Sequence, residues 1–294
     1  MSKSVYEMVT DRIINQLEQG VIPWQKPWTG VRSGAYNRIS KKPYSLLNQM
    51  LLKFDGEYAT FKQWQDLGGH VRKGEKSEIV TFWKIQPVEE EQEDGTKVVK
   101  QIPLLRYFNV FHISQVDGVE PLPEEKLHDI EPIEKADQVL NDYWTRENIT
   151  VEHKAGNRAY YSPTLDMICL PLFEQFNDSS EYYSTAFHES VHSTMKEDRC
   201  NRAEDRKGKI VAFGSQEYSK EELTAEIGSA TILNIIGIET ANSFKNSTAY
   251  IQNWLSVLRN DVKFVVSASS KAEKAVKYIM GEQFTEACSG LRFK

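Results

Sequence analysis

The stretch His188-Glu189-Ser190-Val191-His192 decides both the fold and the chemistry of this chain, because it fits the pattern H-E-x-x-H. Its apolar neighbours, and a cap at Ser184 or Thr185, predict a helix. One helical turn separates the two histidines, so both imidazoles project from one face and can bind a single metal ion. Glu189 follows the first histidine, where a carboxylate can accept a proton from a metal-bound water. The alternative is a helix with two unrelated surface histidines, and a third ligand decides between the two.

A third ligand is present further along the chain, in the segment 221–233. Leu223, Ile227 and Ala230 recur at helical spacing, so we expect a second helix with one buried face. Glu222 and Glu226 are four residues apart and stack on one side of it. Hydrolytic zinc sites commonly use two histidines and one carboxylate, and a second carboxylate can orient a ligating imidazole. The sequence therefore predicts one zinc ion, or another divalent metal, with one of these two acids as its ligand.

The E-x-x-A-E spacing resembles that of gluzincin metallopeptidases, in which the first acid of the pair is the ligand. This resemblance favours Glu222, and Glu226 remains the alternative. A solvated acidic helix face is the interpretation that needs no metal. Upstream, residues 158–171 predict a strand pair, with Tyr160-Tyr161, a Ser-Pro-Thr turn and a second strand from Met167 to Leu170. Zincin folds place such an edge strand beside the metal helix, where it can hold an extended substrate by strand addition.

The composition describes a globular protein with room for two domains. The chain has 294 residues, of which 40% are hydrophobic and 27% are charged. No apolar run reaches the eighteen or so residues that a membrane helix needs, and the first residues lack the apolar core of a secretory signal. Three widely spaced cysteines, Cys169, Cys200 and Cys288, do not make a disulfide framework. We therefore expect a cytoplasmic protein without a membrane partner.

The net charge of −6 is unevenly distributed along the chain. Residues 1–85 contain thirteen Lys or Arg against eight Asp or Glu, whereas residues 86–137 contain five against thirteen. A basic first segment in an acidic protein favours a polyanion partner for that segment. The acidic run at 89–96 predicts a solvated hairpin tip turning at Asp94-Gly95. A second acidic, proline-bearing stretch begins at Asp117 and predicts a linker, which gives domains at 1–116 and 132–294 with the linker at 117–131.

The first domain is expected to combine helices with a small antiparallel sheet. Apolar spacing predicts a helix over 4–19 that Gly20 closes, and further helices over 44–52 and 60–67. Strands are expected over 78–85, 98–102 and 104–113. Aromatic residues in this domain offer stacking faces, and basic residues alternate with them, as in sequence-tolerant single-strand binders. Tryptophans in a small domain are more often core, so the candidates for DNA contact are a set: Trp24, Lys26, Trp28, Arg38, Lys41, Lys42, Tyr44, Trp64, Arg72, Lys73 and Lys76.

Several motifs follow one another in the first half: G-x-x-P-W-x-x-P-W over 20–28, N-x-x-S-x-K-x-Y over 37–44, Phe61-Lys62-Gln63-Trp64 with 68–76, and Tyr107 to Phe111. Through them this half resembles the N-terminal domain of ArdC-type antirestriction proteins. The second half is similar to the zincin-like metallopeptidase domain of that family, through 160–163, the H-E-x-x-H helix, Phe213-Gly214 and 221–226. The acidic insertion at 89–94 departs from the family pattern.

The resemblance implies a single-stranded-DNA-binding domain joined to a metallopeptidase-type domain. It also implies carriage by conjugative or integrative elements, where such proteins protect incoming DNA from host restriction. We therefore predict a two-domain α+β protein, with an N-terminal α+β DNA-binding domain and a C-terminal gluzincin-like domain that holds zinc on His188, His192 and Glu222. Glu189 would act as general base on an unknown protein substrate. Two alternatives stay open: a DNA-coating module with a structural metal, and a peptidase whose first domain recognises protein.

Overall fold

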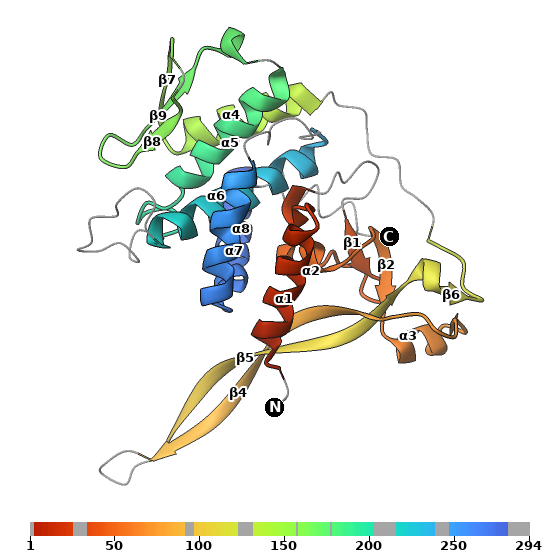
Figure 1. The fold of residues 1–294 in the computed structure, drawn as a ribbon. Helices are drawn as coiled ribbons and strands as arrows, with labels where there is room; N and C mark the ends of the chain where they lie inside the picture. The colour runs from red at the N-terminus through yellow and green to blue at the C-terminus, as the bar shows by residue number, and fades with distance from the viewer. Residues whose placement is uncertain are drawn as a thin grey trace.

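The computed structural model of the chain describes residues 3–25, 34–91, 97–122, 132–156, 158–176, 178–202, 216–238 and 247–281. Figure 1 shows the sheets of the first half below and to the right of the longer helices of the second half. Helices and largely antiparallel sheets together confirm the predicted α+β class. No helix among the residues described is both long and apolar enough to cross a membrane.

The helices of the first half begin where their capping residues predict. Helix α1 (Val5–Glu18) starts after Ser4, whose hydroxyl accepts a hydrogen bond from the Glu7 backbone N–H while the Glu7 carboxylate accepts one from the Ser4 N–H. Thr60 and Gln63 cap α3 (Phe61–Asp66) in the same reciprocal way. Helix α2 (Leu46–Leu51) is shorter than predicted, and a 3-10 turn, η1 (Pro23–Gln25), follows α1.

Two sheets complete the first half. The larger has the strand order β1 (Ala35–Asn37), β2 (Gly56–Ala59), β5 (Lys97–His112) and β4 (Glu78–Glu91), with β1 parallel to β2 and the other pairs antiparallel. The smaller pairs β3 (His70–Val71) with β6 (Val116–Asp117), after the 3-10 turn η2 (Ile113–Gln115). The predicted small antiparallel sheet is therefore present, with one additional parallel strand pair.

Strands β4 and β5 form a long hairpin that extends away from the rest of the molecule (Figure 1). The sequence predicted two strands, 98–102 and 104–113, where the structure has one, because Pro103 pairs opposite Ile85 without interrupting the ladder. Proline is tolerated there because β5 pairs on its other side with β2 only at Phe111 and His112, among the strands described. The predicted turn at 94–95 lies outside the described residues.

The second half contains a three-stranded sheet and five long helices within its described residues. The predicted strand pair is confirmed as β8 (Tyr160–Ser162) and β9 (Met167–Pro171), which are antiparallel. The sequence did not predict β7 (Thr150–Lys154). This strand runs parallel to β9 and makes β9 the central strand. The remaining elements are α4 (Pro132–Arg146), η3 (Phe173–Gln175), α5 (Ser179–Ser193), α6 (Gln216–Ile236), α7 (Ser247–Asn260) and α8 (Phe264–Met280).

A buried arginine fixes the end of α5 to this sheet. The Arg199 guanidinium donates to both carboxylate oxygens of Asp166, at 2.8 Å each, and to the Ser193 carbonyl oxygen at 2.9 Å. Its Nε also donates to Glu147, just after α4. Because the guanidinium is almost fully buried, these partners hold α4, the β8–β9 turn and α5 in one arrangement.

The two halves of the chain share one hydrophobic core. Helices α1 and α2 pack against α6, α7 and α8, and the Trp24 ring lies edge-on to the Trp254 ring with 5.2 Å between centroids. Polar contacts follow the same junction: the Thr10 hydroxyl donates to the Val262 carbonyl at 2.7 Å. The buried members of this core are Val9, Ile13, Leu17, Trp24, Leu46, Leu47, Met50, Leu51, Leu105, Leu223, Ile227, Ala230, Trp254, Val257, Leu258, Phe264, Val265, Val266, Ala268 and Ala272. The two halves therefore pack against each other through this shared cluster, while each half also has buried clusters of its own.

We expect both halves to unfold together when this core is weakened. Replacing Trp254 by Ala removes a buried ring from the junction and should lower the free energy of unfolding by about 3–5 kcal/mol. Denaturant unfolding followed by far-UV circular dichroism and by tryptophan fluorescence should give one coincident transition. Replacing the exposed Trp83 by Ala is the matched control and should change stability by no more than about 0.5 kcal/mol. Two separated transitions in the unsubstituted protein would contradict the shared core.

Candidate metal centre

The helix that carries the H-E-x-x-H motif begins earlier than its sequence suggested. Asp178 caps α5 by accepting a hydrogen bond from the Glu181 backbone N–H at 3.0 Å. The predicted caps Ser184 and Thr185 lie inside the helix instead, and the Thr185 hydroxyl donates back to the Glu181 carbonyl. The extra turn contributes Tyr183 to the core of the second half, which explains why the helix extends in that direction.

A glycine sets the close approach of α6 to α5. A Cβ atom at Gly228 would lie 2.9 Å from Cγ2 of the buried Val191, so a larger residue would force the helices apart. Beside this contact the Ser229 hydroxyl donates to the Ser184 carbonyl at 3.0 Å. The two helices predicted from separate stretches therefore pack directly against each other, on the side that carries the histidines and acids.

The structure brings His188, His192 and Glu222 together. The two histidine Nε2 atoms are 3.1 Å apart, and the Glu222 carboxylate lies 3.5 Å from Nε2 of His188 and 3.4 Å from Nε2 of His192. One ligand atom from each of the three lies within 4.8 Å of the others. Ligands about 2.0–2.1 Å from a tetrahedral zinc ion are roughly 3.3 Å from one another. Both the spacing and the donor set therefore fit a single divalent cation.

Each histidine also has a carboxylate facing its second ring nitrogen. Glu221 Oε1 lies 3.4 Å from Nδ1 of His192, and Glu226 Oε1 lies 3.9 Å from Nδ1 of His188. Carboxylates at this position orient a ligating imidazole and keep its Nε2 available for the metal. Glu226 thus faces the Nδ1 side of His188, while Glu222 faces the Nε2 atoms of both histidines. Glu221 was not among the predicted site residues, and its only signal in the sequence is its place directly before Glu222.

Arg202 holds Glu221 in place. Its guanidinium donates to both carboxylate oxygens, at 2.6 and 3.2 Å, and also to the Val191 carbonyl at 2.8 Å and the Thr194 hydroxyl. The Arg202 side chain is only 4% exposed. A bidentate pair of this kind has little freedom, so the Glu221 carboxylate is fixed before any metal binds.

The electrostatics of the site follow from three carboxylates on one helix that are largely out of solvent. Burial alone would lower the pKa of His192, but hydrogen bonds to Glu221 and Glu222 outweigh it and raise that pKa to about 10. Burial alone would raise the pKa of Glu221, but the charge of Arg202 together with hydrogen bonds from His192 and Arg202 outweighs it and lowers the pKa to about 2. Burial does raise the pKa of Glu226. The acids of α6 therefore favour positive charge at this place, which a bound divalent cation would also supply.

The predicted DNA-binding residues are scattered, and several are not available to a ligand. Trp24 and Trp64 lie in the core, and the Trp64 indole N–H donates to the Phe111 carbonyl at 2.9 Å. Neither ring has a face for a base, because both rings are buried, and the hydrogen bond also fixes the Trp64 ring. The placement of both tryptophans corrects the expectation of stacking platforms at these two positions.

The other candidates divide by their partners. Arg38 forms an ion pair with Glu57, and Arg72 pairs with Glu75 and Asp117, so neither guanidinium is uncompensated. Tyr44 is half-buried and packs edge-on against Tyr58. Lys42, Lys73 and Lys76 are exposed, Lys41 is half-buried, and Lys26 and Trp28 lie outside the described residues, as do Phe213-Gly214.

Comparison with known proteins agrees with this arrangement. Residues 3–111 match the family described as the N-terminal domain of anti-restriction factor ArdC, and residues 135–271 match the zincin-like metallopeptidase family. The antirestriction protein ArdC from plasmid R388 has a similar structure in its Mn(II)-bound form, with a TM-score of 0.71, 30% identity, 99% of this chain and 100% of that chain covered. The chain belongs to the ArdC-type antirestriction protein family.

A second structure and three further proteins are also similar to this ArdC-type chain. The metal-free structure of the R388 protein matches equally well, with a TM-score of 0.71 and 28% identity. An uncharacterized protein of Sinorhizobium fredii, y4eC, is 31% identical over 95% of this chain and 92% of its own length. Two Escherichia coli proteins named DNA primase TraC are 33% and 32% identical, and the chain spans 20% and 27% of their lengths. The Mn(II)-bound structure of a relative and the zincin-like family match support a bound metal, while zinc at His188, His192 and Glu222 remains a prediction.

The three acids should differ in what they contribute to metal affinity. Replacing Glu222 by Gln removes a ligand and should weaken zinc binding by more than about 100-fold, the upper end for residues that only orient a ligand. Replacing Glu221 or Glu226 by Gln should weaken it by about 10- to 100-fold. Titration calorimetry on metal-stripped protein would measure this, with exposed Glu174→Gln as the control. A larger loss from Glu226→Gln than from Glu222→Gln would reverse the ligand assignment.

Proposed function

We propose that this protein binds single-stranded DNA, protects it from restriction during transfer of a mobile genetic element, and carries a zinc metallopeptidase in its second half. The proposal of a metallopeptidase rests on the ligand atoms of His188, His192 and Glu222, which lie within 4.8 Å of one another. Membership of the ArdC-type family and the basic first segment support the DNA part. The likeness to a plasmid protein supports carriage on a mobile element.

The residues present can perform peptide hydrolysis in a defined order. A zinc ion held by His188, His192 and Glu222 would polarise the scissile carbonyl and lower the pKa of a water molecule. Glu189, the next residue along α5 and only 8% exposed, would accept a proton from the attacking water and pass it to the leaving amine nitrogen. Glu221 and Glu226 would keep both imidazoles oriented throughout.

The sheet beside the motif helix offers a place for an extended peptide. Strand β8 packs against α5 and pairs only with β9 among the strands described, so its other edge can accept a further strand. Backbone hydrogen bonds along such an edge hold a substrate without demanding one sequence. This arrangement suits a peptidase whose specificity comes from a few side-chain positions.

Replacing Glu189 by Gln separates catalysis from metal binding. The substitution removes the proton acceptor but keeps the size of the side chain, so zinc should remain bound while peptide cleavage falls by about 100- to 10,000-fold. Cleavage of denatured protein substrates and bound zinc would be measured on the same preparations. Protection of an incoming unmodified plasmid in a restricting host is the cellular measurement. Full protection by the Glu189→Gln variant would show that protection does not use peptidase activity, as in a DNA-coating module.

Single-stranded DNA binding should depend strongly on salt. Each phosphate that the protein neutralises should contribute about −0.7 to the slope of log K against log salt. Fluorescence anisotropy with a labelled single strand, repeated across a salt series and against the matching duplex, would measure the slope and the preference. A response that is absent, or that is equal for the duplex, would reject the DNA assignment and favour a first half that recognises protein.

A further inference from the structure

We propose that single-stranded nucleic acid binds in a groove between β4 and α8, which takes one wall from each half of the chain. The inference rests on the proposed DNA-binding function and names the surface that carries it. It places part of the nucleic-acid site on a helix of the metallopeptidase half, and none of the candidates that the sequence suggested is among its lining residues.

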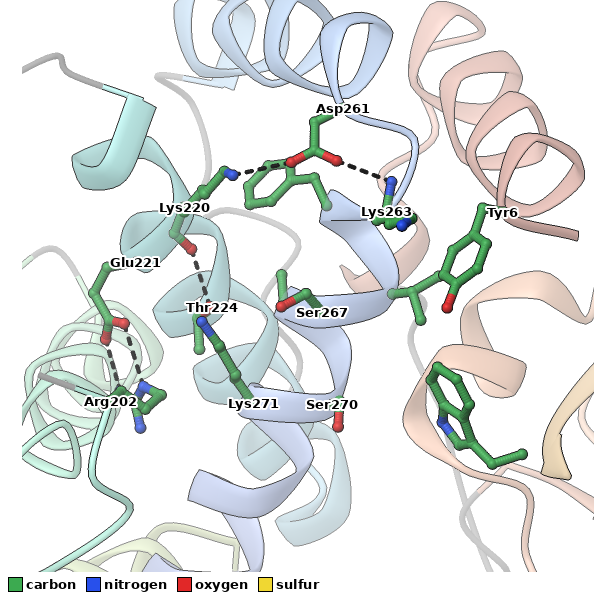
Figure 2. A pocket seen from close by; sticks show the side chains of 14 residues that line it. Tyr6, Arg202, Lys220, Glu221, Thr224, Asp261, Lys263, Ser267, Ser270 and Lys271 are labelled. Atoms are coloured by element: carbon green, nitrogen blue, oxygen red, sulfur yellow. Dashed lines mark hydrogen bonds and ion pairs between the residues drawn. The ribbon is translucent and has the colours of Figure 1, made fainter. Parts of the chain in front are cut away.

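The groove consists of two adjoining hollows. The larger has a volume of about 740 Å³ and the smaller about 410 Å³, and they share Trp83, Val266 and Ser270 as lining residues. Figure 2 shows Tyr6 of α1 across the larger hollow from Arg202 and Glu221, with Ser267, Ser270 and Lys271 of α8 between them. Hollows of a few hundred cubic ångströms accommodate ligands of about nucleotide size, and two in a row suit a chain of nucleotides.

An aromatic ring on the β4 wall is available for stacking. Trp83 is 51% exposed, whereas Trp24, Trp64 and Trp254 are buried and the Trp144 indole N–H donates to Ser190. Among the tryptophans that the structure describes, Trp83 is therefore the one that presents an open ring face to a ligand. It lines both hollows, so a base stacked on it would have neighbours on either side. Stacking on aromatic side chains is how proteins bind single strands without reading their sequence.

The α8 wall carries three lysines and one acid, Glu273, which forms an ion pair with Lys277. Ser267, Ser270, Lys271, Lys274 and Lys277 recur at helical spacing and all line the groove. The Lys274 ammonium donates to the neutral Cys200 carbonyl at 3.3 Å, so this hydrogen bond does not cancel its charge. Six basic and three acidic side chains line the whole groove, although the net charge of the protein is −6. This local excess attracts a polyanion, and the exposed indole selects one that carries bases.

The groove is next to the metal centre, with Glu221 between them, and does not include the metal ligands. Arg202 and Glu221 line the larger hollow on one side, while Glu221 faces His192 on the other. His188 and Glu222 line neither hollow. A single strand in the groove would therefore leave the metal ligands and the edge of β8 free for a peptide.

Variants of the groove test the proposal in the full-length protein. Trp83→Ala, and the double variant Lys271→Ala with Lys274→Ala, should each weaken binding of fluorescein-labelled oligothymidylate by about 5- to 100-fold at fixed salt. Trp83→Phe keeps a stacking face and should restore most of the affinity, while losing the quenching of tryptophan fluorescence that a stacked base causes. Phe61→Ala removes another exposed aromatic of the first half, and Lys53→Ala with Lys62→Ala removes two exposed lysines outside the groove. Both are matched controls and should change the affinity less.

The outcomes separate this proposal from the DNA-binding function on which it rests. If the unsubstituted protein binds the oligonucleotide and the groove variants bind it equally well, with unchanged unfolding midpoints, the groove is overturned and the DNA-binding function stands. Loss with the lysine variant but not with Trp83→Ala also overturns it, because the groove would then be an anion or acidic-peptide site without base stacking. If the unsubstituted protein does not bind, the DNA-binding function itself fails, and the groove proposal fails with it.

Discussion

The structure depends on the contact between α5 and α6 at Gly228 and Val191, because this contact gathers five ionisable side chains at one buried place. Three carboxylates on one helix cannot be removed from water unless positive charge accompanies them. Arg202 supplies one such charge to Glu221 through a bidentate pair. The same demand makes the site attractive to a divalent cation. Metal affinity is thus a consequence of how these two helices pack.

Helix α6 also ties the metal centre to the first half of the chain. Glu222 and Glu226 face the histidines, whereas Leu223, Ile227 and Ala230 belong to the core that α1 and α2 share with α7 and α8. A core of this kind does not allow one half to rotate against the other without exposing apolar surface. The groove between β4 and α8 exists because of this junction, since neither wall alone would enclose it. The position of any bound nucleic acid relative to the metal centre is therefore fixed by the fold.

Local patterns in the sequence predicted about half of the helices and strands, among them the two helices that carry the candidate metal ligands. The H-E-x-x-H spacing and the acid pair on 221–233 depend only on the period of a helix, whereas the choice of Glu222 over Glu226 came from the resemblance to gluzincin metallopeptidases. The caps at Ser4 and Thr60 are equally local. Long-range packing was not accessible: Trp24 is buried because Trp254 lies against it, and Trp83 is exposed because β4 belongs to a projecting hairpin. Arg202 and Glu221 meet across nineteen residues, and no spacing rule predicts that pair.

The Arg202–Glu221 pair lies between the metal centre and the groove and contacts both. Arg202 lines the groove, but its guanidinium is committed to Glu221, to the Val191 carbonyl and to Thr194, and it is nearly buried. For a phosphate to draw it away, the Glu221 carboxylate would have to remain buried without its partner, which costs several kcal/mol in proteins, about 3–5 when such a pair is broken. Lys274 on α8 gives up much less when it turns to a phosphate, because it is exposed and donates to a neutral carbonyl, that of Cys200. Phosphate contacts should therefore fall to the lysines, and the arginine keeps the metal centre insulated from what the groove holds.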